Sequence, residues 1–267
     1  MKPYKLAMLM VAAGSLLSVN AMAQVFNYNT GDLLLGFRTA GGTSDLVVDI
    51  GSASLYTGAT GPITISGNYY TGSQLTSAGL SLNNLGFSVF GDSPAGSLWV
   101  TSPLANPNVP VAPFAAQNLG TLNFSSAQME SIAYGATYTS YLNSSGPNNT
   151  ASAVVVPSSL NLGSEGALSY TTGIGANGNF NGAFGSNNNI EQSTPADFTT
   201  GSYVEGDRSA LFQMNPGADG SYVGFFELDP NGTLTFNPEP VPEPGTFAVF
   251  GMGLIGLAGW RRITRKS

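Results

Sequence analysis

The sequence predicts a mainly β protein: an antiparallel β-sandwich or jelly-roll-like body with long polar loops, between an N-terminal signal helix and a C-terminal transmembrane helix. Three observations favour this class. Short runs of β-branched, aromatic and aliphatic residues recur along the chain. Clusters of Gly, Pro, Asn and Ser separate these runs, as turns separate strands. Helix signals are few and short, so strands must supply most of the core.

The clearest strand covers residues 45–50, where acidic and apolar residues alternate. Leu46, Val48 and Ile50 fall on one face of such a strand, whereas Asp45 and Asp49 fall on the other. This alternation is typical of a strand that is buried on one face only. It predicts that both aspartates are solvated.

The strongest hairpin signal joins residues 222–228 to 233–236. The connection, Asp229-Pro230-Asn231-Gly232, combines the fixed φ of proline with a glycine that tolerates positive φ. The side chains predicted to face inward are Tyr222, Phe226, Leu228, Leu234 and Phe236. Shorter strands are predicted at 33–37, 86–90, 98–101, 121–124, 153–156 and 210–214.

Two segments carry helix signals, and one loop allows two interpretations. Ser125 and Gln128 match a capping box and predict a short helix that ends at Ala133. A weaker helical pattern covers 73–85. The Gly/Asn-rich segment 171–189 either makes tight turns that dock its two phenylalanines or forms a mobile loop.

The N-terminus has the three parts of a secretory signal peptide. Lys2 and Lys5 precede an apolar stretch, and Ala21-Met22-Ala23 supplies the small residues of a cleavage site. We therefore expect signal peptidase to remove residues 1–23, cutting after Ala23. The extracytoplasmic body then covers residues 24–237.

The C-terminal tail also has three parts. A Pro/Glu linker at 238–245 cannot be helical, because each proline fixes φ and restricts the residue before it. Residues 246–260 carry no charge and span about 22 Å as a helix, short of a hydrocarbon core of about 30 Å. Arg261 and Arg262 open a basic end, 261–267, which predicts a stop-transfer signal with the C-terminus in the cytoplasm.

This order of Pro242-Glu243-Pro244, apolar span and Arg261-Arg262 resembles the PEP-CTERM sorting signal of Gram-negative bacteria. The resemblance covers residues 241–267. It implies that an exosortase-like membrane enzyme recognises Pro242, Glu243 and Pro244. It also implies an exported protein, held at the inner membrane by its tail and then placed at the cell surface or in an exopolysaccharide or biofilm matrix. An ordinary anchor with a proline-rich stalk is the alternative.

Composition excludes several functions. Between residues 24 and 241 only Arg38 and Arg208 are basic, against fourteen Asp and Glu, so the body has a net charge near −12. Nucleic acid is excluded as a partner, because phosphate binding needs clustered Lys and Arg. The chain has no Cys and no His, which excludes disulfides, a thiol nucleophile and a Ser-His-Asp triad. No cofactor and no metal site is predicted, although calcium bound by scattered loop oxygens stays open.

The leading interpretation is a non-enzymatic, exported surface or matrix protein, with exopolysaccharide as a candidate partner. A carbohydrate-binding module is the second interpretation, and a glycan-cleaving enzyme the third. The enzyme needs two carboxylates about 5–9.5 Å apart, whereas Asp45 and Asp49 lie about 13 Å apart along a strand. The tyrosines that would stack on sugar rings are Tyr69, Tyr70, Tyr134, Tyr138 and Tyr141.

Overall fold

The computed structural model describes residues 25–93, 95–104, 114–142, 150–163, 165–184, 189–201 and 206–238. The predicted signal helix, sorting linker, membrane span and basic end lie outside these ranges, apart from Pro238. Across the part of the chain that is described, no helix has the length and apolar character needed to cross a bilayer.

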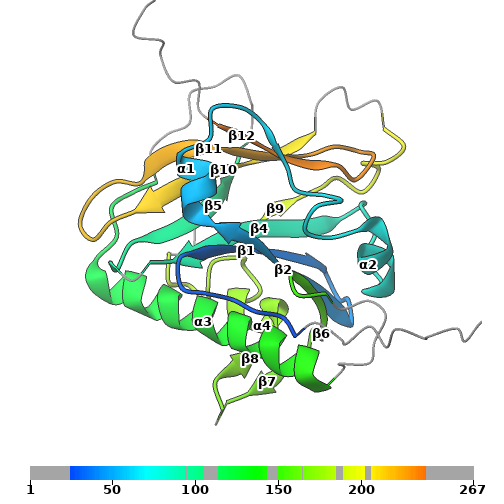
Figure 1. The fold of residues 1–267 in the computed structure, drawn as a ribbon, viewed down its shortest axis with the longest axis horizontal. Coiled ribbons are helices and arrows are strands. Elements are labelled where there is room, and N and C mark those ends of the chain that lie inside the picture. The colour runs from blue at the N-terminus through cyan, green and yellow to red at the C-terminus, as the bar shows by residue number, and fades with distance from the viewer. Residues whose placement is uncertain are drawn as a thin grey trace, which may run out of the picture.

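The body is built on one ten-stranded antiparallel sheet that curls strongly into a half-barrel (Figure 1). The mainly β prediction is confirmed, but the strands form a single curled sheet and not the two packed sheets of a sandwich or jelly roll. The strands run in the order β3 (Ile63–Thr64), β12 (Leu234–Pro238), β11 (Ser221–Leu228), β10 (Asp207–Met214), β5 (Leu98–Pro103), β4 (Leu85–Asp92), β1 (Asp32–Thr39), β2 (Ser44–Ser52) and β6 (Ala153–Pro157), with β9 (Gln192–Ser193) beside β4. A separate hairpin joins β7 (Asn161–Leu162) to β8 (Ala167–Leu168).

The described helices are α1 (Ala53–Thr57), α2 (Gly72–Ser77), α3 (Leu119–Leu142) and α4 (Tyr170–Ile174). In Figure 1, α3 lies on the side of the sheet opposite β11 and β12. The strand predicted at 121–124 is therefore wrong, and the short helix predicted from Ser125 to Ala133 is the middle of a 24-residue one. The helix begins earlier because the Asn118 side chain accepts the Thr121 N–H at 2.9 Å. Ser125 instead lies inside the helix, where its hydroxyl donates to the Thr121 carbonyl.

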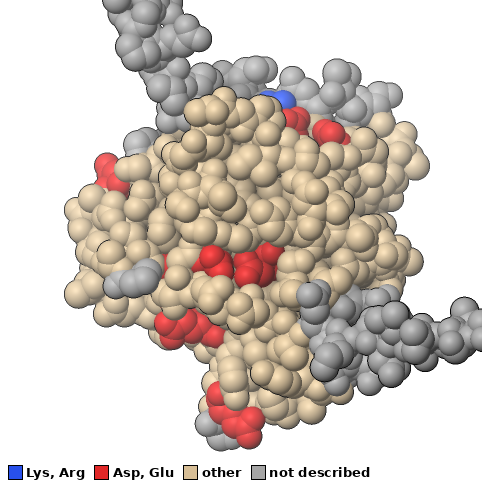
Figure 2. All heavy atoms as spheres, in the orientation of Figure 1, with Lys and Arg blue, Asp and Glu red and all other residues tan. Residues whose placement is uncertain are grey.

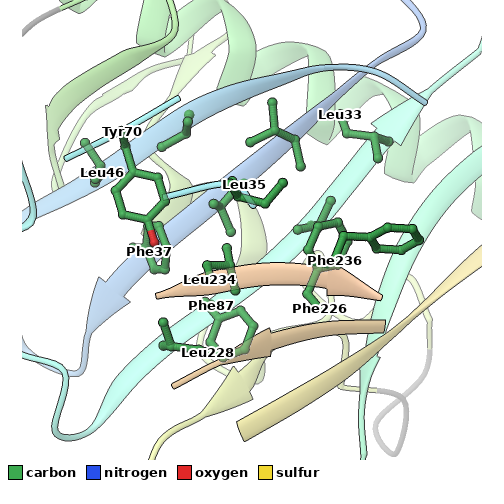
Figure 3. Close-up of a cluster of buried hydrophobic side chains, with 14 of the residues drawn as sticks. Leu33, Leu35, Phe37, Leu46, Tyr70, Phe87, Phe226, Leu228, Leu234 and Phe236 are labelled. Carbon is green, nitrogen blue, oxygen red and sulfur yellow. The ribbon is translucent and has the colours of Figure 1, made fainter. Parts of the chain in front are cut away.

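The concave face of the curled sheet encloses the inner core. Curling brings β11 and β12 across from β1 and β2, so Leu35 and Phe37 lie near Leu234 and Phe236 (Figure 3). Phe226 and Phe236 have ring centroids 5.0 Å apart, and both rings are fully buried. A sheet that curls over its own concave face in this way needs no second sheet to cover that apolar face.

The convex face of the sheet packs against the outer core. Leu34 and Val47 point away from the inner core and meet Met129 and Ile132 of α3. Both faces of β1 and β2 are therefore covered, which explains the uninterrupted apolar run at the start of β1.

The cover on the convex face corrects the prediction for Asp45 and Asp49. Asp45 has no exposed surface, and Asp49 is 9% exposed. Both aspartates do share the face opposite Leu46 and Val48, as their alternation predicts. The face of β2 that carries both aspartates is covered by other parts of the protein, whereas the alternation predicted that it faces solvent.

The predicted hairpin is confirmed, with one exception. The Asp229 N–H donates to the Thr233 carbonyl, and the Gly232 N–H donates to the Asp229 carbonyl, both at 2.8 Å. The four apolar side chains predicted on the inner face lie there. Tyr222 does not: a β-bulge shifts the register between Leu211 and Phe212 and turns Tyr222 to the outer core, with its ring centroid 5.8 Å from that of Phe212.

The Gly/Asn-rich segment follows the docked interpretation as far as it is described. Phe180 is fully buried and Phe184 is 1% exposed. Phe180 packs edge-on against Phe90 of β4, with 5.5 Å between centroids. Positive φ angles at Phe180 and Asn181 produce the tight turn that makes this possible.

Gly135 sets how closely α3 approaches β8. A Cβ at this position would lie 2.0 Å from the carbonyl oxygen of Leu168. We expect Gly135→Ala to lower the unfolding free energy by at least about 2 kcal/mol, because the clash is with backbone. Helix propensity alone predicts the reverse, a gain of about 1 kcal/mol.

Urea denaturation of the two forms measures this difference. The matched control is Ala127→Gly, at an exposed position of the same helix, which should cost about 0.5–1 kcal/mol. A Gly135→Ala protein more stable than the parent would show that α3 is not held against β8 in this way.

Candidate functional site

A hollow of about 410 Å³ opens between the β1–β2 turn, the start of β4 and the chain after α4. Arg38 and Glu191 contribute charged side chains to its lining, and Gly41, Gly42 and Gly86 contribute backbone. This volume lies in the lower part of the range of about 300–1,000 Å³ found for small-molecule sites. The hollow is the candidate site because it joins an open space to a buried polar network.

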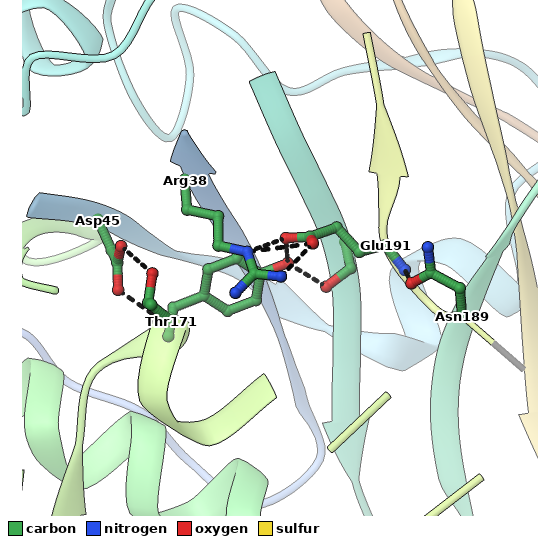
Figure 4. Close-up of polar contacts among 7 residues, drawn as sticks. Arg38, Asp45, Thr171, Asn189 and Glu191 are labelled. Carbon is green, nitrogen blue, oxygen red and sulfur yellow. Dashed lines mark hydrogen bonds and ion pairs between the residues drawn. The ribbon is translucent and has the colours of Figure 1, made fainter. Parts of the chain in front are cut away.

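Arg38 and Glu191 form a two-pronged ion pair (Figure 4). Arg38 Nε donates to Glu191 Oε1 at 2.8 Å, and Nη2 donates to Oε2 at 2.6 Å. The two side chains are 13% and 7% exposed. Burial lowers the pKa of Arg38, but the hydrogen bond and charge of Glu191 outweigh it and raise that pKa above its ordinary value. The guanidinium therefore stays charged at any physiological pH.

Tyr170 lies beneath the pair, fully buried. Its hydroxyl donates to Glu191 Oε1 at 2.8 Å and lies 2.7 Å from Ser88 Oγ. The ring covers Gly36 so closely that a Cβ there would lie 2.3 Å from a ring carbon. Burial, and then the charge of Glu191, raise the pKa of Tyr170 well above its ordinary value, so the phenol stays protonated and continues to donate.

Asp45 fixes the segment that carries Tyr170. Its carboxylate accepts the Thr171 N–H and the Thr171 hydroxyl, each at 2.7 Å (Figure 4). Burial raises the pKa of Asp45 to about 6, against the opposing effect of the two Thr171 hydrogen bonds. Both carboxylate oxygens of Asp45 are therefore engaged with Thr171, and the role of Asp45 is to hold the backbone of the site in place.

Glu191 is positioned by the residues that precede it. Its own N–H donates to Asn189 Oδ1 at 2.9 Å. Ile190 is fully buried, its N–H donates to the Gly178 carbonyl at 2.8 Å, and its carbonyl accepts the Thr101 hydroxyl at 2.8 Å. These contacts fix the backbone on which the carboxylate depends, so the ion pair is preorganised.

Two donors beside the hollow have no hydrogen-bond partner within the described ranges. One is Nη1 of Arg38, since Nε and Nη2 make all of the bonds to Glu191. The other is the buried hydroxyl of Thr39, the next residue along β1. Both residues line the hollow.

The tyrosines proposed for sugar stacking do not gather at this hollow. Tyr70 is 2% exposed and packs edge-on against Phe37 of the inner core. Tyr134 and Tyr141 are 47% and 64% exposed on α3, with Tyr138 between them on the same helix. Three of the five thus share a helix and do not lie on a sheet face.

Carboxylates outside the hollow make local contacts. Asp92, at the end of β4, accepts hydrogen bonds from Tyr28 at 2.5 Å and Ser126 at 3.2 Å. Burial, and then the nearby Asp92, raise the pKa of Glu130 above its ordinary value. Over the part of the chain described, no three Asp or Glu side chains are grouped to hold a metal ion. Figure 2 shows scattered acidic groups and very little basic surface on the face it presents.

Sequence reasoning did not identify Arg38, Glu191, Tyr170 or Thr171 as site residues. A signal for Arg38 was present, since it is one of two basic residues in the body and directly follows the apolar run 33–37 within β1. Its partner lies 153 positions away. No local pattern marks Glu191.

The residues predicted for sorting and processing lie outside the described ranges: Ala21, Ala23, Pro242, Glu243, Pro244, Arg261 and Arg262. Residues 240–263 match the family described as PEP-CTERM protein-sorting motif. The tail is therefore a PEP-CTERM signal, which implies an exported protein that exosortase sorts to the cell surface. Comparison with curated proteins and with solved structures found no match to the chain.

Proposed function

We propose that this protein is a non-enzymatic component of the cell surface or of an exopolysaccharide matrix, released there after exosortase cuts its tail at Pro242-Glu243-Pro244. The match of residues 240–263 to the sorting motif is the observation that carries the proposal. The match begins at the last residue of the upstream Pro238-Glu239-Pro240 copy and includes the whole of the second copy. This favours the second copy as the processing site.

The end of the folded body lies very close to that site. Strand β12 ends at Pro238, four residues before Pro242. Four extended residues reach at most about 14 Å. A processing enzyme would therefore work beside the edge of the sheet formed by β3 and β12, and the released body would keep only a short stub.

The surface chemistry of the body agrees with an extracellular role. Its net charge near −12 repels nucleic acid and anionic lipid headgroups. The two basic residues are taken up by ion pairs, Arg38 with Glu191 and Arg208 with Glu227. The remaining surface is mostly uncharged and polar, which suits contact with neutral, hydrated polymers.

Mass spectrometry of protein released from the cell surface tests the processing step. We expect a C-terminus near Pro242 in the parent, and an intact tail in Glu243→Ala, because that substitution removes the acidic residue of the motif. Glu239→Ala, the same change in the upstream copy, is the matched control and should be processed as the parent is. Released parent protein that still carries Arg261-Arg262 would contradict processing and leave a plain anchor.

A further inference from the structure

We propose that the hollow above the Arg38–Glu191 pair binds a neutral polyhydroxylated ligand, one or two residues of a saccharide, through hydrogen bonds. This assigns the body a ligand and a site. The proposal names a ligand class for the matrix role proposed above. It rests on that role only for the choice of a saccharide as the ligand. Exosortase processing is independent of it.

The charge of the site favours a neutral ligand. Arg38 and Glu191 neutralise each other within the lining of the hollow, where they are the charged residues. An anionic ligand would meet the Glu191 carboxylate and a body of net charge near −12. A cation would meet the guanidinium, which cannot lose its proton.

The remaining hydrogen-bonding capacity matches adjacent hydroxyl groups. Arg38 Nη1 has no hydrogen-bond partner among the described residues, whereas the hydroxyl of the adjacent Thr39 is buried and does not reach the open space. Among the described residues Glu191 Oε2 accepts hydrogen bonds only from Arg38, and a carboxylate oxygen can accept more than one bond. A donor and an acceptor therefore lie side by side, which is what two neighbouring hydroxyls require.

The shape of the hollow also favours a small polar ligand. Gly41 and Gly42 leave backbone open at the rim, and Ala40 and Ala176 are the only apolar side chains among the described lining residues. A side chain at Gly86 would displace the carboxylate, because its Cβ would lie 2.8 Å from Glu191 Oε1. None of the described residues that line the hollow is aromatic, so the proposed binding does not depend on stacking. We expect weak binding, with a Kd on the order of 1–10 mM.

Saturation-transfer NMR tests the proposal on the full chain, in a detergent without a sugar headgroup. The probes are D-glucose, D-galactose and cellobiose, with D-glucuronate as the anionic comparison. We expect saturation transfer to at least one neutral sugar, and weaker transfer to glucuronate. No transfer to any neutral probe at about 20 mM, several times the expected Kd, would overturn the proposal. Stronger binding of glucuronate would replace it with an anion site.

A blocking variant locates the binding. Ala40 is exposed and lines the hollow, so Ala40→Trp should fill the space without touching the ion pair, and should weaken binding at least about tenfold. Ala127→Trp, at an exposed position of α3, is the matched control and should bind as the parent does. Thermal melting of both variants verifies folding. Equal binding by Ala40→Trp would place the sugar elsewhere and contradict the assignment, whatever the result for tail processing.

Discussion

Replacing Glu191 by alanine is expected to lower the free energy of unfolding by about 3–5 kcal/mol. The change leaves the Arg38 guanidinium, only 13% exposed, without the carboxylate that neutralises it. It also removes the acceptor of the Tyr170 hydroxyl, which is fully buried. Breaking one side of a buried ion pair costs more than the pair contributes, because the remaining charge stays desolvated.

Denaturant titration of three forms measures this effect. The double variant Arg38→Met/Glu191→Leu removes both charges and should recover a large part of the lost stability. Glu227→Ala is the matched single change, because it breaks the pair with Arg208 on the strands β10 and β11, where the side chains are 17% and 19% exposed. Its cost should be smaller, about 1–2 kcal/mol, because water reaches this pair more easily than the Arg38–Glu191 pair. A double variant less stable than Glu191→Ala would show that charge desolvation is not the dominant effect.

The sequence was sufficient for the local elements whose signals lie within a few residues. The β11–β12 hairpin is an example, because its turn chemistry and alternation act over short distances. The docking of Phe180 and Phe184 was only one of two predicted alternatives, because the same Gly/Asn-rich composition also fits a mobile loop. Only the middle of helix α3 was predicted, because serines and threonines dilute its apolar pattern and its stability comes from packing on the convex face.

Sheet curl and the candidate site depend on long-range contacts, which no local pattern reports. Alternation in 45–50 correctly separates Leu46 from Asp45, but it does not say what covers each face. The cover on the Asp45 side includes Thr171, 126 positions away. Arg38 and Glu191 meet only because β9 pairs with β4, which in turn pairs with β1. The site could therefore be seen only after the topology was known.

The burial of Asp45 and Asp49 leads to the second large effect, an unfolding free energy that rises as the solution is acidified. Burial raises the pKa of each carboxyl to about 6, from an unfolded value of 3.8. The folded state therefore binds protons more tightly than the unfolded state does. The resulting stabilisation is fully present below pH 3.8 and is lost as the pH rises through about 6.

Each aspartate contributes up to about 3 kcal/mol to this difference, because a pKa shift of one unit corresponds to about 1.4 kcal/mol. Urea denaturation at pH 4.5 and pH 7.5 should show a more stable protein at the lower pH. The direction is opposite to that of a fold held by ionised carboxylates, which loses stability in acid. Acidification also lowers the net negative charge of the body, and the weaker repulsion between its carboxylates raises stability at low pH as well. Variants must therefore separate this effect from the protonation of the two buried aspartates.

Asp45→Asn and Asp49→Asn make that separation. An amide resembles the protonated carboxyl, and its oxygen can still accept the Thr171 N–H at position 45 or the Gly51 N–H at position 49. Each variant should be more stable than the parent at pH 7.5 and should flatten the pH dependence. Asp219→Asn, on an exposed loop, changes the net charge equally and is the matched control. If all three variants keep the full slope of the parent, the two buried aspartates are not its source, and the repulsion of the acidic surface must be.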